Sequence, residues 1–135
     1  MIGNNSASVL ADAYLKGVRV EDTRTLMNGL LHATKAVHPK ISSTGRKGWE
    51  WYNSLGYVPA DAGIDESAAR TLEYAYNDWC ILRLGRTLGW DRAALDTLAH
   101  RSMNYRHLFD PETKLMRGRN QDGSFRTPFS PFKWV

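Results

Sequence analysis

The residues best suited to chemistry are concentrated in the segment 67–79, which reads SAARTLEYAYNDW. Its second half places two carboxylates, Glu73 and Asp78, among three aromatic rings. Aromatic faces stack on sugar rings and carboxylates hold sugar hydroxyls, so this composition is typical of a carbohydrate site. The alternative is a core helix whose charges are solvated, and the spacing alone favours that alternative.

The two carboxylates do not suit paired acid–base catalysis. Hydrolysis of a glycosidic bond with inversion needs two carboxyl groups about 6.5–9.5 Å apart. Glu73 and Asp78 are five positions apart on a predicted helix, so their side chains point about 140° away from each other. We therefore assign no catalytic residue to this chain.

The sequence predicts no metal site of its own. His32 and His38 are six positions apart, and His100 and His107 are seven apart, whereas helical metal pairs favour a step of four. We interpret all four as surface or packing residues. The single cysteine, Cys80, lies in an apolar stretch and is expected to be a buried small hydrophobe.

The composition argues against nucleic-acid and membrane partners. Lys and Arg total 18 against 14 Asp and Glu, a net charge of +4 that is spread along the chain. Nucleic-acid binders usually concentrate basic residues on one face. The sequence also has no apolar run of about 18 residues.

The hydrophobic periodicity predicts an all-α fold of two helical hairpins. The expected helices are 6–16, 22–37, 66–88 and 92–108, with a short one at 48–55. The first hairpin then covers about 5–37, the second about 66–108, and an aromatic-rich connection, 38–66, joins them as a candidate rim or lid. The tail, 109–135, is expected to be irregular or to form a small β-hairpin at Asp122-Gly123.

The apolar residues of the expected helices lead to two further predictions. Trp79 is expected in the core, on a stripe with Leu72, Ala75 and Leu82, and to matter more for folding than for sugar contact. Other apolar side chains are expected on the lateral faces of the hairpins, which would make the isolated chain self-associate; they are Leu26, Leu30, Leu95 and Leu98.

Four ordered motifs resemble glycoside hydrolase family 92, the calcium-dependent exo-acting α-mannosidases. They are MIGNNSASVLADAYLKGV, GYVP, TLEYAYNDWCILRLGRTLG and RSMNYRHLFDPETKLMRGRNQDGSFRTPF. The resemblance runs from Met1 to Trp134. It implies an (α/α)6 barrel behind a β-sandwich domain, and hydrolysis of α-mannosides with inversion.

The resemblance also implies that residues 1–135 are an internal segment of the catalytic barrel. The chain is too short for six hairpins and a sandwich, and the acid and base motifs of the family, of the YTEGN and DDxG types, are expected downstream. The calcium ligands are expected largely downstream as well. The partners would be a mannose-containing glycan and the remainder of the barrel and sandwich, in a secreted or periplasmic enzyme. The alternative is a non-catalytic helical interaction or carbohydrate-binding module.

The resemblance further implies which residues line the sugar pocket. The helices 6–16 and 66–88 fit the inner role in the barrel, which places Asn4 and Asn5 of GNN, and Tyr57 of GYVP, at the active-site end. The family often has His where this chain has Asn5.

The helix 66–88 is expected to add Glu73, Asp78 and Trp79 to this pocket. Asp78 and Trp79 match a DDW-like segment in which Asn77 replaces an acid. The alternative for these two residues is a buried aspartate held by loop amides against a core tryptophan.

Overall fold

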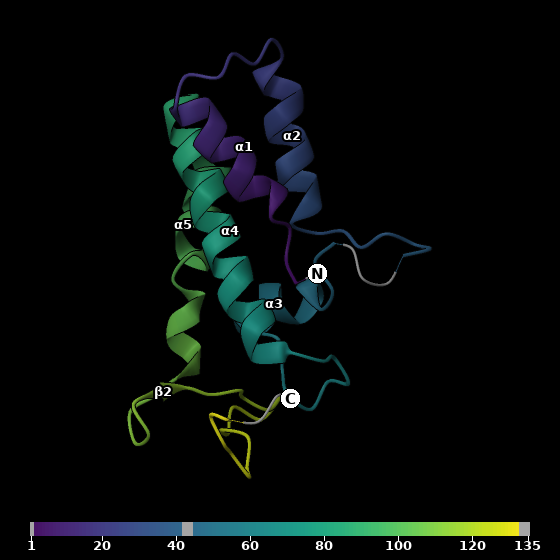
Figure 1. The fold of residues 1–135 in the computed structure, drawn as a ribbon, viewed down its shortest axis with the longest axis vertical. Helices are drawn as coiled ribbons and strands as arrows, with labels where there is room; N and C mark the ends of the chain where they lie inside the picture. The colour runs from purple at the N-terminus through teal and green to yellow at the C-terminus, as the bar shows by residue number, and fades with distance from the viewer. Residues whose placement is uncertain (1, 42–44, 133–135) are drawn as a thin grey trace.

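The computed structural model describes residues 2–41 and 45–132. Helices dominate these segments (Figure 1). In chain order the elements are α1 (Ser6–Leu15), α2 (Thr23–Ala33), α3 (Trp49–Leu55), α4 (Ser67–Thr87), α5 (Arg92–Arg101), the 3-10 helix η1 (Asn104–Leu108), β1 (Phe109–Asp110) and β2 (Leu115–Met116).

The long helix α4 is the centre of the fold, because α1, α2, α5 and η1 all pack against it. The connection between α1 and α2 lies at the same end of the molecule as the connection between α4 and α5 (Figure 1). Helices α1 and α4 therefore run in the same direction, and α2 and α5 return beside them. The described residues are therefore helix-rich, as predicted.

Local capping explains where two of the helices begin. The Asp22 carboxylate accepts a hydrogen bond from the Thr25 backbone N–H at 2.9 Å, and Asp91 accepts one from Ala94 at 3.0 Å. Both bonds satisfy amides that have no partner within the first turn of a helix. They fix the starts of α2 and α5, the returning helices of the two hairpins.

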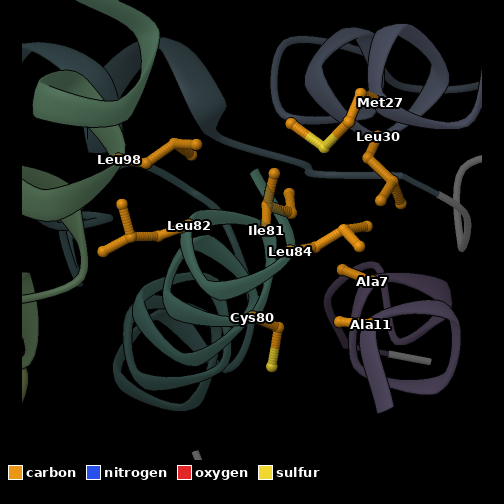
Figure 2. Packing of buried hydrophobic residues seen from close by; sticks show 9 residues of the cluster. All are labelled: Ala7, Ala11, Met27, Leu30, Cys80, Ile81, Leu82, Leu84 and Leu98. Carbon is orange, nitrogen blue, oxygen red and sulfur yellow. The ribbon is translucent and has the colours of Figure 1, made fainter. Parts of the chain in front are cut away.

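The main core lies where the two hairpins meet (Figure 2). Small side chains of α1 let this helix approach α4 closely, and Gly85 does the same for α5. A Cβ at Gly85 would lie 2.7 Å from Leu95 Cδ2 and 3.1 Å from Met27 Cε. The buried members are Ala7, Ala11, Met27, Leu30, Cys80, Ile81, Leu82, Leu84 and Leu98.

The connection between the hairpins is packed rather than loose. Val58 donates its backbone N–H to Thr71 Oγ1 at 2.9 Å, and the Tyr74 hydroxyl donates to the Lys47 carbonyl at 2.8 Å. Tyr52, Val58 and Tyr74 form a second buried cluster. The described part of the connection is thus an extension of the core beside the first half of α4.

The tail contains the predicted small β structure. β1 and β2 pair antiparallel, and a bridge between Arg119 and Phe125 closes the predicted turn at Asp122-Gly123. The Ala60 backbone N–H donates to the Arg119 carbonyl at 2.7 Å, which ties the tail to the connection. Residues 133–135 lie outside the described residues.

Two predicted helices end earlier than expected. α2 ends at Ala33 rather than at Val37, and the helix expected over 92–108 ends at Arg101 before a 3-10 segment. In both places a hydroxyl at the end competes for a backbone carbonyl: Thr34 donates to Leu31 and Ser102 donates to Ala99, both at 2.8 Å.

The apolar faces also differ from the prediction. Leu30 and Leu98 lie in the main core, and Leu26 and Leu95 pack against it, so these four side chains do not form open lateral faces. Trp79 is 47% exposed. Ala75 and Leu82 of the predicted stripe are buried, as expected, whereas Leu72 is only partly buried. Beside them α4 also buries the polar residues Asn77 and Asp78, which a stripe of apolar residues does not include.

No helix in residues 2–41 and 45–132 has the length and apolar character needed to cross a membrane. Several exposed apolar side chains gather in one groove beside α4. A groove of about 410 Å³ between α4 and the end of α5 is lined by Leu72, Tyr76, Trp79, Met103 and Tyr105, together with Ala75 and Ser102.

We predict that the isolated 135-residue chain self-associates through this groove, because exposed apolar patches tend to find partners. Light scattering coupled to size exclusion should show concentration-dependent species above 15.3 kDa. Trp79→Arg should weaken the association, whereas the matched control Val9→Arg, on the exposed side of α1, should not. A 15.3 kDa species at every concentration would contradict the prediction.

Candidate functional site

A buried ion pair lies at the junction of the connection and α4. The side chains of Arg46 and Asp78 are both fully buried, and Arg46 Nη1 lies 2.7 Å from Asp78 Oδ1. Asp78 comes from the middle of α4, whereas Arg46 comes from a stretch, ISSTGRKG, whose composition is that of a loop. Sequence reasoning missed Arg46 because a single arginine in a polar loop carries no periodic signal.

Two tyrosines enclose the guanidinium group. The Arg46 Cζ atom lies 5.0 Å from the ring centroid of Tyr74 and 5.7 Å from that of Tyr52. The two rings meet edge to face, with centroids 5.5 Å apart at 88°. Cation–π contacts gain strength when the cation is desolvated, so the rings compensate part of the cost of burying the charge.

The Tyr52 hydroxyl completes the cluster. It donates to the Arg101 carbonyl at 2.9 Å and lies 3.3 Å from Asp78 Oδ2. Burial, together with the Asp78 carboxylate, raises the pKa of Tyr52 far above its ordinary value, so the phenol stays protonated. Burial also raises the pKa of Asp78, and the Arg46 guanidinium opposes this rise.

This geometry corrects the expectations for Asp78. Loop amides were expected to hold a buried carboxylate, but a guanidinium and a phenol surround it instead. Because the side chain is fully buried, it offers no surface to a sugar hydroxyl.

The start of α1 lies beside Glu73 on another side of α4. A Cβ at Gly3, where φ is 78°, would lie 3.3 Å from Glu73 Cβ and 3.5 Å from Asn77 Nδ2, so the backbone approaches closely here. Asn4 Oδ1 accepts a hydrogen bond from the Ser6 hydroxyl. Asn5 precedes α1 without forming a side-chain cap, and it is exposed.

Two exposed aromatic side chains, Tyr76 and Trp79, lie further along α4 from Glu73. Tyr76 and Trp79 stack with their centroids 6.1 Å apart at 20°, and Arg83 Cζ lies 5.9 Å from the centre of the Trp79 ring. The predicted site residues Asn4 and Asn5 thus lie just before α1, and Glu73 and Trp79 lie on α4, with Asn4 and Glu73 partly exposed and the other two exposed. We call these four residues, with Tyr76, the outer face.

Tyr57 lies apart from this face. It is buried, its ring lies 6.1 Å from that of His107, and its hydroxyl donates to the Asn120 carbonyl at 3.0 Å. Burial raises its pKa above the ordinary value. Its observed contacts hold the connection against η1 and the tail.

In the described part of the chain, no three His, Cys, Asp or Glu side chains gather in a way that would hold a metal ion. Cys80 is buried with a free thiol, as predicted.

Comparison with known proteins decides the family. The family model for the glycosyl hydrolase family 92 catalytic domain matches residues 1–135. The chain belongs to glycosyl hydrolase family 92. An uncharacterized secreted glycosidase from Arthroderma benhamiae is 32% identical over 127 residues, which cover 87% of this chain and 16% of that protein.

Solved structures of family 92 share the fold. An inverting mannosidase from Bacteroides thetaiotaomicron superimposes with a TM-score of 0.92 at 42% identity, over 99% of this chain and 18% of its own. A second α-mannosidase from this organism matches with a TM-score of 0.84 at 36% identity, over 99% and 17%. That second enzyme has also been solved with mannoimidazole, and this complex matches with a TM-score of 0.83 at 37% identity, over 97% and 16%. The chain thus spans less than one fifth of the length of these relatives.

We predict that Trp79 matters little for the stability of this chain and that Tyr74 matters greatly. Tyr74→Ala removes a fully buried ring that contacts Arg46 and should cost about 3–5 kcal/mol in the free energy of unfolding. Trp79→Ala removes a half-exposed ring and should cost about 1 kcal/mol or less. Urea unfolding of both variants tests this, and equal losses would show that Trp79 is a core residue after all.

Proposed function

We propose that this chain is part of a glycoside hydrolase that removes α-linked mannose from glycans with inversion. The observation that carries the proposal is the likeness to an inverting mannosidase over 99% of the chain at 42% identity. In this proposal the segment supplies scaffold and part of the sugar pocket, and the catalytic carboxylates come from elsewhere in the protein.

Within the whole protein, we propose that α1/α2 and α4/α5 are two hairpins of an (α/α)6 barrel. The parallel course of α1 and α4, with α2 and α5 behind them, supports this assignment (Figure 1). Residues 1–135 would then be a partial catalytic domain: hairpins over about 5–37 and 66–108, the connection 38–66 and the tail 109–135. The rest of the barrel and a β-sandwich domain would complete the protein around these two hairpins.

The outer face is the proposed sugar contact. Asn5 offers an exposed side-chain amide, Glu73 a carboxylate, and Trp79 with Tyr76 an exposed aromatic platform. This combination suits a pyranose, which presents hydroxyls at its edge and an apolar face for stacking. Asn4 flanks this face, whereas Tyr57 and Asp78 are positioning residues.

Calcium, if the whole protein uses it, would be held by residues elsewhere in the protein. The relative named as a secreted glycosidase supports a secreted or periplasmic location for the whole protein.

A carbohydrate-binding module without catalysis is the second candidate. It is favoured by the separation of the two carboxylates, since Asp78 is buried and only Glu73 reaches the outer face. The 135-residue chain alone would then bind mannose-containing glycans without hydrolysing them.

We predict that the intact protein releases mannose from α-linked mannobiose in the presence of calcium, and that NMR detects β-mannose as the first anomer. Trp79→Ala should raise KM about tenfold, because a stacking contact contributes about 1 kcal/mol or more. Trp79→Phe should retain most of the affinity, and the 135-residue chain alone should show no turnover.

Two results would contradict the proposal. Release of α-mannose first would exclude inversion. A Trp79→Ala variant with unchanged KM would remove the outer face from the sugar pocket while leaving the family assignment intact.

A further inference from the structure

A cavity of about 570 Å³ lies between α3 and the segment formed by α5 and η1. It shares no residue with the outer face. The side chains that line it from α3 are uncharged, whereas those of α5 and η1 include Arg101, His100 and His107. The cavity therefore has one neutral wall and one wall rich in basic groups.

Arg101 is the central group of the basic wall. Its side chain is half-buried, and within the described residues its guanidinium forms no ion pair, unlike Arg46, Arg92 and Arg117. Burial lowers the pKa of Arg101, which means that its surroundings compensate the charge only in part. A half-buried guanidinium without a carboxylate leaves strong hydrogen-bond donors for a ligand.

The neighbouring charged groups leave an excess of positive charge around the cavity. Behind the cavity, the Asp78 carboxylate is already paired with Arg46, and within the described residues it forms no ion pair with Arg101. Asp96 is the acidic residue of the lining, and it pairs with Arg92 at 3.0 Å on the exposed surface. An excess of positive charge in a partly desolvated cavity is costly unless an anion neutralises it.

We propose that this cavity binds a doubly charged oxyanion, a phosphate or sulfate group, held by Arg101 with His100 and His107 beside it. The planar guanidinium matches two oxygens of such a group at once, which a lysine ammonium does not. The imidazole rings add N–H donors at the edge of the cavity. This site is independent of the proposed glycosidase activity.

The test compares the effect of sulfate on the intact protein and on two variants. Sulfate stabilises many proteins by exclusion from their surface, so the wild-type response alone decides nothing. Calorimetric titration should give a sulfate dissociation constant that is about tenfold weaker, or more, in Arg101→Gln. Arg86→Gln, at the exposed end of α4, is the matched control and should bind sulfate as the wild type does.

A second variant keeps the proposal testable if Arg101→Gln does not fold. Thr97→Glu changes an exposed residue of the cavity lining, leaves Arg101 in place and adds a repelling carboxylate. It should also weaken sulfate binding about tenfold, because one charge within reach is worth at least one charge-assisted hydrogen bond. Equal binding by the wild type, Thr97→Glu and Arg101→Gln would overturn the proposal.

Two further ligands identify the source of the anion. Mannose 6-phosphate that binds more tightly than inorganic phosphate would indicate an ester group on a sugar, with mannose alone as the control. Equal binding of the two phosphates would indicate a free anion.

Discussion

The arrangement of this chain depends on burying one arginine and one aspartate together. Taking two charges out of water costs several kcal/mol for each, and only good geometry with further compensation offsets the cost. Arg46 and Asp78 meet this condition through their 2.7 Å contact, the rings of Tyr52 and Tyr74, and the Tyr52 hydroxyl. Because neither charge tolerates isolation, the connection has one position against α4 in the folded state.

The backbone before Arg46 is shaped to deliver its side chain. The Arg46 N–H donates to the Ala36 carbonyl at 2.9 Å, and Val37 pairs with Gly45 in an isolated β-bridge. Gly45 adopts a φ of 86°, and a Cβ there would lie 2.5 Å from the Ala36 carbonyl oxygen. A glycine is therefore required at the position before the buried arginine. The buried Arg46 side chain then meets Asp78 and the Tyr74 ring on α4.

Part of this structure was predictable from the sequence. Short-range rules act within a few residues, and they correctly indicated the helix-rich fold, the buried Cys80 and the different directions of Glu73 and Asp78. The exposure of Trp79 on α4 was not predictable from such short-range rules. An exposed Trp79 and a buried Asp78 reverse the usual preferences, and only the long-range partner Arg46 accounts for the second of them.

The most direct test of the central ion pair is a double-mutant cycle on the free energy of unfolding, with Arg46→Met and Asp78→Asn. Each single substitution leaves one partner of a buried contact uncompensated and should cost about 3–5 kcal/mol. The double substitution should cost less than the sum of the two by about 2 kcal/mol or more, since groups in contact are coupled. Additivity within about 0.5 kcal/mol would contradict this account, because it would mean that the connection and α4 are held together by other contacts.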